Sequence, residues 1–156
     1  MRRPERTTVA ATKADGGMER TLAILKPDAV ARGICGEIIS LIERAEFSIT
    51  ALRLLRLTRE QAAQFYAVHA HRPFYGSLCQ YMSSGPVVVA VLQADRAIER
   101  WRQLMGATDP AKAAAGSIRQ RFGLDVERNA VHGSDGLETA QREIGFFFSA
   151  LDLLAL

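Results

Sequence analysis

Apolar and polar residues follow two spacings along this chain, one typical of strands and one typical of helices. Residues 21–25 and 87–92 are continuous apolar runs, which indicate strands buried on both faces. A shorter strand-like run ends at His132. Helical spacing recurs in residues 38–45 and 97–105, so an amphipathic helix is expected in each segment.

Residues 47–57 have the alternation of a strand, but both of its faces are apolar. One parity carries five apolar side chains: Phe47, Ile49, Ala51, Leu55 and Leu57. Leu52 and Leu54 make the opposite face apolar as well. If helices cover the first face, something else must cover the second. We therefore predict a contact with another subunit along this strand.

Helix starts are predicted from capping patterns. Thr58 followed by Gln61 reads as a capping box that opens a helix, and a second short helix is expected over residues 74–82. Asp135 with Glu138 reads as another box just after His132. Gly133, which directly follows His132, is expected to allow backbone angles that other residues avoid. The free N–H groups of that last helix would then face the imidazole and favour an anion there.

The order of these segments predicts an α+β fold. It reads strand, helix, strand, helix pair, strand, helix, long loop, strand, helix, which is a ferredoxin-like β-α-β-β-α-β sandwich on an antiparallel four-stranded sheet, with added helices. The long loop covers Gly106 to Gly116. Residues 1–18 show no periodicity and are expected to be a disordered tail, which leaves residues 19–156 as a single domain.

Composition narrows the class of protein. The 156 residues are 48% hydrophobic, enough for one domain with a core. A net charge of +3 and a pI near 9.2 suit a polyanionic partner, either nucleic acid or a nucleotide. Cys35 and Cys79 lie too far apart in the chain to suggest a zinc site or a disulfide framework. The absence of a signal peptide pattern and of an apolar run of ~18 residues predicts a cytoplasmic protein without a membrane span.

Phosphate chemistry would need an unusual source of positive charge here. The chain has neither the glycine-rich P-loop nor the Rossmann glycine pattern. It offers instead a lysine at a strand end, an arginine on a helix edge and a polar loop followed by a further arginine: Lys26, Arg102, Thr108 and Arg119. Each alone is typical of a solvated surface residue. Only their convergence in space would make a site.

Five segments then carry a family resemblance. They are Thr21–Val30 with its Lys-Pro-Asp, Arg72-Pro73-Phe74, Ser84-Gly85-Pro86-Val87, Met105–Pro110, and Asn129–Asp135 with its His-Gly-Ser-Asp. In this order and at this separation they resemble the motifs of nucleoside diphosphate kinases, from about Glu19 to Phe148. The resemblance implies a ping-pong phosphotransferase, in which His132 takes the γ-phosphoryl group of a nucleoside triphosphate and passes it to a nucleoside diphosphate.

The resemblance also implies a role for each matching residue. Glu143 would orient the imidazole of His132, and Ser134 would bind Glu143. Lys26 and Asn129 would bind the ribose hydroxyl region, Lys26 also the transferred phosphoryl group, and Tyr66 would help to fix His132 and Lys26. The nucleotide would be held by a stacking ring at Phe74 and by phosphate-binding groups at Arg102, Thr108 and Arg119, with His69 less strongly indicated. Mg²⁺ would be the cofactor, held mainly by the phosphates of the nucleotide.

The chain departs from the usual motif at two places. Arg119-Gln120-Arg121-Phe122 stands where Arg-Gly-Asp-Phe is usual, and Ala115 stands where a proline is common. Both changes affect the expected path of the loop and any subunit contact that it makes. The implied assembly is a homo-oligomer, a hexamer or a tetramer built from dimers.

Two other functions compete with this interpretation. A basic ferredoxin-like domain can bind nucleic acid, but such sheets usually display aromatic residues, and residues 87–92 contain none. Nucleic acid is therefore not expected as a partner. A member of the family that had lost catalysis could serve as a scaffold. Against this, six residues of the implied site are intact: Lys26, Arg102, Arg119, Asn129, His132 and Glu143.

Overall fold

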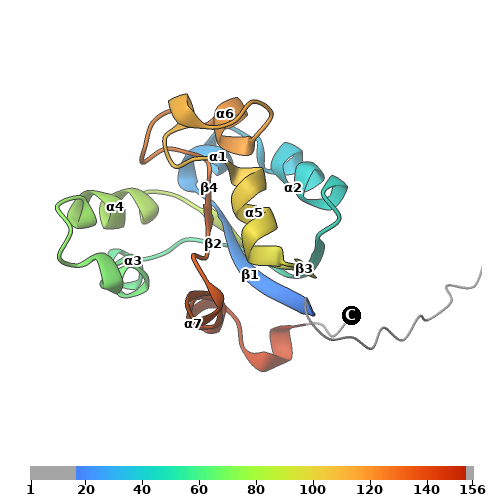
Figure 1. Cartoon of the computed structure of the whole chain (residues 1–156). Coiled ribbons are helices and arrows are strands. Elements are labelled where there is room, and N and C mark those ends of the chain that lie inside the picture. The colour runs from blue at the N-terminus through green and yellow to red at the C-terminus, as the bar shows by residue number, and fades with distance from the viewer. Residues whose placement is uncertain (1–16, 154–156) are drawn as a thin grey trace, which may run out of the picture.

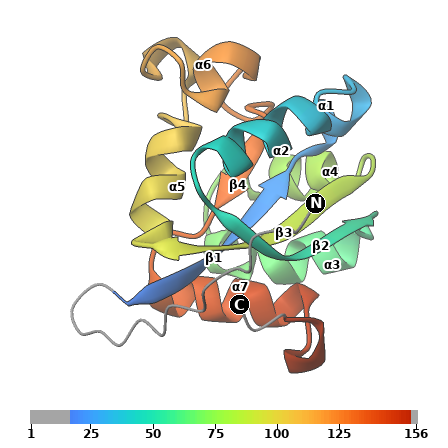
Figure 2. The same ribbon diagram turned by 90° about the vertical axis from the view of Figure 1, so that its right-hand side faces the viewer.

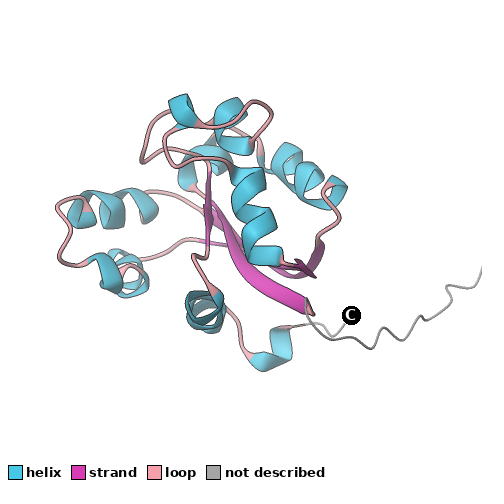
Figure 3. Ribbon diagram, viewed as in Figure 1, coloured by secondary structure: helices cyan, strands magenta, loops and turns pink. Residues whose placement is uncertain are grey.

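The computed structural model describes residues 17–153, which form a four-stranded antiparallel sheet in the order β2-β3-β1-β4 (Figure 1). The strands are β1 (Met18–Leu25), β2 (Ser48–Leu55), β3 (Val87–Asp95) and β4 (Val131–Gly133). Strand β1 begins at the last residue of the predicted tail, and residues 1–16 of that tail lie outside the described residues. Figure 3 shows β4 as a strand between two loops, the second of which leads into α7.

Helices cover both faces of this sheet. Helices α2 (Cys35–Arg44) and α5 (Ala97–Met105) pack on one face. On the other face lie α3 (Arg59–Phe65), α4 (Tyr75–Met82) and α7 (Leu137–Phe147), and Figure 2 shows these two layers from the side of α2 and α5. The shorter elements are α1 (Pro27–Ala31), α6 (Ile118–Phe122), and the 3₁₀ turns η1 (Ala67–His69), η2 (Pro110–Lys112) and η3 (Ala150–Asp152). The predicted ferredoxin-like fold is confirmed.

The continuous apolar runs in β1 and β3 follow from this double covering. Ala23 and Leu25 of β1 join a core with α2 and α5, whereas Leu22 and Ile24 join a second core with α3, α4 and α7. Because successive side chains point to opposite faces, a strand between two helical layers needs apolar residues at every position. No helix within residues 17–153 is both long and apolar enough to cross a membrane.

Strand β2 differs from its prediction because it contains an irregularity. Its pairing with β3 shifts register between Ile49 and Ala51, as in a β-bulge. The extra residue reverses the parity, so Phe47 and Ile49 pack in the first core, whereas the later members of the predicted row, Ala51, Leu55 and Leu57, pack in the second. The prediction that these five side chains share one face of the strand was therefore wrong. Leu52 and Leu54 remain 52% and 65% exposed at this edge of the sheet.

The capping predictions had mixed outcomes. Thr58 and Gln61 form the expected box, with reciprocal hydrogen bonds of 3.1 and 2.9 Å between side chain and backbone. The box expected at Asp135 and Glu138 is absent, because the N-cap of α7 is Gly136, without a side-chain cap. Asp135 binds Arg102 instead. The predicted long loop contains η2 and leads into α6, a helix too short for its spacing to be read from the sequence.

Candidate active site

The pairing of β4 with β1 places the imidazole of His132. His132 lies opposite Ile24 in the sheet, so its side chain points to the layer of α3 and α7. Its Nε2 lies 3.0 Å from Oε1 of Glu143 on α7, and the same oxygen accepts a 2.8 Å hydrogen bond from Oγ of Ser134. The His132 side chain is 18% exposed and that of Glu143 7%. The relation between histidine, glutamate and serine that the resemblance implied is therefore present in the geometry.

Ring contacts hold the imidazole from the side. Phe65 and Tyr66 approach it edge-on, with centroid distances of 5.5 and 6.0 Å. Both residues lie at the end of α3, where the helix gives way to η1. The buried hydroxyl of Tyr66 has no hydrogen-bond partner among the described residues, so it makes no bond to Lys26 here. Burial raises the pKa of this hydroxyl, which keeps it protonated.

Gly133 is required for packing rather than for backbone angles. Its φ is not in the left-handed region, which corrects our expectation. A Cβ built on it would lie 2.6 Å from both Cε of Met105 and Cδ1 of Trp101. Trp101 is completely buried, and its indole N–H donates a 3.2 Å hydrogen bond to the carbonyl of His132. The glycine thus lets α5 approach β4 closely enough to hold the histidine backbone.

Lys26 reaches the site from the end of β1. Its Nζ donates to Oδ1 of Asn129 at 2.8 Å and to the carbonyl of Glu127 at 3.2 Å. Asn129 is held in turn by the carbonyls of Thr108 and Val126, at 2.9 and 3.1 Å. Burial, with the nearby charge of Arg119, lowers the pKa of the Lys26 ammonium to about 8. An anion bound beside this ammonium would raise that pKa again.

Arg119 is held inside the site although its side chain is charged. Its two terminal nitrogens donate to the carbonyls of Gly106 and Val131, at 3.0 and 2.8 Å, while the buried Nε has no acceptor among the described residues. Burial and the charge of Arg102 lower the pKa of the guanidinium to about 10. A buried cation with a free donor, close to two other cations, favours an anionic ligand.

These groups surround one cavity of about 570 Å³. All the candidate residues of the sequence analysis line it except Ser134 and Glu143, which lie behind His132. The candidates at the cavity are Lys26, Tyr66, His69, Phe74, Arg102, Thr108, Arg119, Asn129 and His132. The structure therefore brings together residues that are separated by more than a hundred positions in the chain.

Other lining residues were not found from the sequence. Leu78, Val126, Glu127 and Asp135 also line the cavity. Leu78 lies on α4, where its spacing is that of an ordinary apolar helix residue. Val126 is in an irregular segment, which has no periodicity to mark it. The sequence predicts a helix-capping role for Asp135. Its Oδ1 instead binds Nη1 of Arg102 at 2.7 Å.

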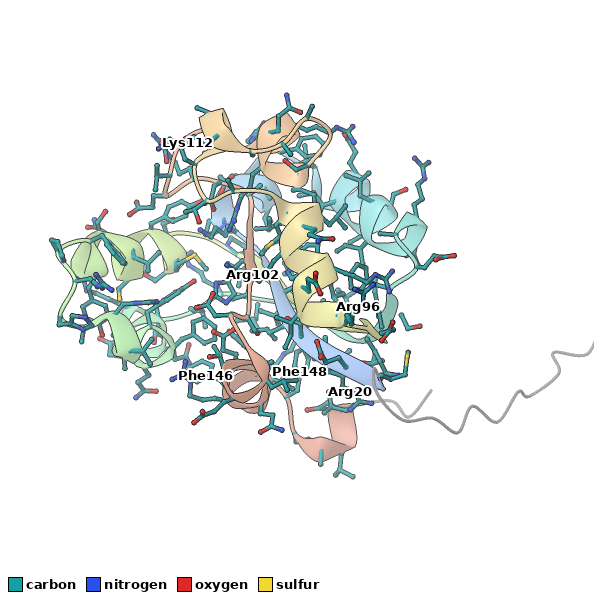
Figure 4. The ribbon with its side chains drawn as sticks, viewed as in Figure 1. Arg20, Arg96, Arg102, Lys112, Phe146 and Phe148 are labelled. Carbon is teal, nitrogen blue, oxygen red and sulfur yellow. The ribbon has the colours of Figure 1, made fainter. Side chains whose placement is uncertain are left out.

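Arg102 and Lys112 differ in their relation to this cavity. Figure 4 shows Arg102 in the middle of the molecule, where α5 faces β4, and Lys112 at the loop above it. Arg102 lines the cavity together with Asp135, and half of its side chain is exposed. Lys112 is not among the lining residues, and its side chain lies 4.0 Å from Asp109.

The departure at Gln120 has a local explanation. Ser117 caps α6 by accepting a hydrogen bond from the backbone N–H of Gln120 at 3.3 Å, and the Gln120 side chain accepts one from Gly116 N–H at 3.2 Å. This reciprocal pair closes the turn that carries Arg119. The guanidinium of Arg121 lies 4.9 Å from the ring centroid of Phe122. Nothing in the structure explains Ala115.

The fold and the site together define a class of protein, a ferredoxin-like α+β domain with a histidine at the wall of a basic cavity. A family model described as nucleoside diphosphate kinase matches residues 19–153. A nucleoside diphosphate kinase of Desulfovibrio desulfuricans is 55% identical over 136 residues, which are 87% of this chain and 98% of the relative. One of Syntrophotalea carbinolica is 56% identical over 137 residues, 88% of this chain and all of the relative.

Solved structures of nucleoside diphosphate kinases are also similar to this chain. The nucleoside diphosphate kinase of Aquifex aeolicus superposes with a TM-score of 0.87 at 48% identity, covering 88% of this chain and all of that one. A halophilic nucleoside diphosphate kinase from Halobacterium salinarum, solved in complex with CDP, gives a TM-score of 0.85 at 38% identity, covering 88% and 92% of the two chains. The chain belongs to the nucleoside diphosphate kinase family, whose members transfer phosphoryl groups between nucleotides.

Proposed function

We propose that His132 carries the phosphoryl group in this reaction, taking the γ-phosphoryl group of a nucleoside triphosphate and passing it to a nucleoside diphosphate. The observation that carries this proposal is the placement of the imidazole. Glu143 holds one of its nitrogens from behind, and the ring lines a cavity that also contains Lys26 and Arg119.

The contact with Glu143 decides which nitrogen reacts. A carboxylate can only accept hydrogen bonds, so Nε2 of a neutral imidazole carries the proton and donates it to Oε1. The lone pair then resides on Nδ1, which is the nucleophile. Ser134 donates to the same oxygen and fixes its orientation. The imidazole thus has the tautomer and the position required before any nucleotide binds.

Each half of the reaction exchanges one bond to phosphorus for another. In the first half, a bond forms between Nδ1 and the γ-phosphorus, and the bond from that phosphorus to the β-phosphate oxygen breaks. The nucleoside diphosphate leaves with that electron pair. The Nε2 proton stays shared with Glu143, which stabilises the positive charge on the phosphorylated ring. In the second half, a terminal oxygen of the acceptor diphosphate attacks the same phosphorus, and Nδ1 recovers its lone pair.

The cations of the cavity stabilise the charge that moves during transfer. Lys26 and Arg119 are buried and held by several hydrogen bonds, so they need little reorganisation when the phosphoryl group arrives. Arg102 is more exposed and is paired with Asp135. Only Nη1 of Arg102 binds that carboxylate, so the other N–H groups of the guanidinium remain available to a phosphate. Thr108 and His69 line the same cavity and would complete the phosphate-binding groups.

The outer part of the cavity suits the base and the ribose. Phe74 is 48% exposed, and Leu78 and Val126 line the cavity with it. A ring face stacks on purines and pyrimidines alike, which favours broad nucleotide specificity. The amide nitrogen of Asn129 already donates to two carbonyls, so its Oδ1, next to Lys26, would accept a hydrogen bond from a ribose hydroxyl.

We also propose Mg²⁺ as the cofactor. Residues 17–153 contain no group of three or more His, Cys, Asp and Glu side chains that could hold a metal ion. The cavity offers cations for phosphates instead, so the donor set fits a metal that is carried by the phosphate oxygens of the nucleotide. When bound, Mg²⁺ supplies neutralisation of the phosphate charge.

The exposed edge of β2 supports a homo-oligomer built from dimers, as a hexamer or a tetramer. Leu52 and Leu54 lie on this edge strand, where a strand of a second copy could cover them. We expect Leu52→Lys with Leu54→Lys to lower the sedimentation coefficient, and Leu137→Lys, at a similarly exposed position on α7, to leave it unchanged. A wild-type monomer at micromolar concentration would contradict this assembly. A cytoplasmic location is also proposed, since Cys35 and Cys79 are free thiols.

Incubation with γ-labelled ATP tests the central proposal. We expect an acid-labile, alkali-stable phosphoprotein, and we expect His132→Ala to abolish both this label and transfer from ATP to GDP. His71→Ala is the matched control, because His71 is exposed and is not among the residues that line the cavity. Full labelling of His132→Ala would refute the mechanism. Nucleic-acid binding by the sheet is disfavoured, because Val87–Ala94 of β3 are buried under helices.

A further inference from the structure

Asp28, which is buried, contacts the partly buried Tyr81, and neither residue is among those that line the cavity. The Tyr81 hydroxyl donates to Oδ1 of Asp28 and accepts a 3.0 Å hydrogen bond from the Asp28 backbone N–H. Burial and the bond to Asp28 raise the pKa of this hydroxyl, so it stays a donor. The two residues join α1 to α4 across 53 positions of the chain.

The second oxygen of the Asp28 carboxylate reaches the catalytic segment. Oδ2 accepts a 3.1 Å hydrogen bond from the backbone N–H of Ala130, which is completely buried. Ala130 has a φ of 73°, in the left-handed region that is sterically costly for a residue with a Cβ. Its carbonyl accepts a 2.9 Å hydrogen bond from the backbone N–H of Lys26. Asp28 therefore holds a strained residue on one side while the start of the Lys-Pro-Asp segment holds it on the other.

The position of Ala130 in the chain gives this contact a consequence for the site. Asn129 precedes it and binds Lys26 Nζ, whereas Val131 follows it and begins the strand that carries His132. A change in the backbone at Ala130 would move Asn129 and His132 relative to each other. Strained residues persist only where the surroundings hold them, and they occur often at functional sites.

We propose that Asp28, oriented by Tyr81, is a positioning residue for phosphoryl transfer, which sets the left-handed backbone at Ala130 and thereby the relative placement of Lys26, Asn129 and His132. This inference rests on the proposed role of His132. In this role, neither Asp28 nor Tyr81 touches the nucleotide. The effect is on the geometry of the reacting groups, so it concerns the rate of transfer more than nucleotide binding.

The charge of Asp28 adds a second, separable effect on Lys26. Burial and the charge of Arg119 lower the pKa of Lys26, whereas the carboxylates of Asp28, Glu127 and Asp125 raise it. If the charge of Asp28 is removed, one of the groups that raise the pKa of Lys26 is lost, and burial and Arg119 lower that pKa further. Lys26 would then lose its proton at a lower pH than it does in the wild-type protein.

The test compares two tyrosines of the same helix. Tyr81→Phe removes the hydroxyl that orients Asp28, and Tyr75→Phe removes a hydroxyl that donates to the Ala63 carbonyl at 2.8 Å. We expect Tyr81→Phe to lower kcat for ATP-to-GDP transfer about tenfold with KM within twofold, and Tyr75→Phe to retain the wild-type kcat. Melting temperatures of both variants show how far each one alters stability. A wild-type kcat in Tyr81→Phe would overturn the proposal.

Asp28→Asn provides a readout that loss of stability alone would not change. We expect the alkaline limb of its kcat/KM profile to move to lower pH than in the wild type, because Lys26 deprotonates earlier. An unmoved limb would overturn the electrostatic part. Labelling of the wild-type protein with ATP distinguishes a failure of the proposed role of His132 from a failure of the positioning role of Asp28. If it fails to form phosphohistidine, the proposed function is wrong, whereas normal labelling with unaffected variants rejects only the positioning role.

Discussion

The inner and outer halves of the cavity are built differently. In the inner half, His132, Lys26 and Asn129 are each held by hydrogen bonds to neighbouring side chains or backbone carbonyls. In the outer half, Phe74 and Val126 are exposed apolar side chains, which have no polar groups through which hydrogen bonds could hold them in place. The protein therefore positions the reacting groups in advance and leaves the base region permissive. Pre-organisation lowers the cost of reaching the transition state, whereas exposed apolar contact contributes binding without selecting a base.

Lys26→Met should produce the largest change among variants that leave the nucleophile intact. It removes a buried cation beside the transferred group, and loss of such a pre-organised group costs roughly 10²–10³ in kcat. Lys112→Met is the control, because the exposed Lys112 lies outside the cavity lining. Steady-state ATP-to-GDP transfer measures both. If Lys26→Met affected only KM, the inner half would be a binding region rather than the centre of the reaction.

Glu143→Gln should have the next largest effect. The substituted amide can still accept a hydrogen bond from Nε2, but it lacks the charge that stabilises the phosphorylated ring, so we expect kcat to fall about 10²-fold. Glu138→Gln, on the exposed face of the same helix, serves as control. Rapid-quench measurement of phosphohistidine formation checks this prediction. An unchanged rate of that single step would show that Glu143 only packs against the ring.

The pH dependence should report Lys26 directly. Its pKa of about 8 lies below that of an ordinary lysine, and its charged form is the one that attracts phosphate. Above pH 8, kcat/KM should therefore fall by about tenfold per unit, as the free protein loses that proton. Lys26→Arg should abolish this fall, because a guanidinium stays charged over the same range. A fall that persists in Lys26→Arg would assign the limb to another group.

Phe74→Ala should have the smallest effect, and it should be on binding. Base stacking is worth ~1–3 kcal/mol per base, and a half-exposed ring beside other apolar side chains should lie at the lower end, so KM should rise about fivefold with kcat retained. Val68→Ala, at a position that is also 48% exposed, is the control. ADP affinity by calorimetry checks this change. A fall in kcat equal to that of Glu143→Gln would remove the distinction between the two halves.

The sequence predicts those features that repeat or match a motif. Four strands, the sequence of elements along the chain and the candidate residues follow from periodicity and from the family segments, and the structure brings all of these residues except Ser134 and Glu143 to the wall of one cavity. The bulge at β2 leaves no such signal, because one extra residue changes parity without changing composition. The need for Gly133 depends on how close Trp101 approaches, and the contact of Asp28 depends on a tyrosine 53 residues away. Both are properties of packing, which no local pattern records.

The register shift in β2 also bears on how the protein avoids uncontrolled association. An edge strand with two exposed leucines is a template on which strands of other molecules can add without limit. The bulge leaves one residue out of the regular ladder and increases the local twist. The exposed Arg53, which lies between the two leucines in sequence, places a charge on the opposite face of the same strand. The contact with a second copy that we propose would therefore cover this edge over a short, defined length, whereas continued addition of strands is opposed by the shape and charge of β2 itself.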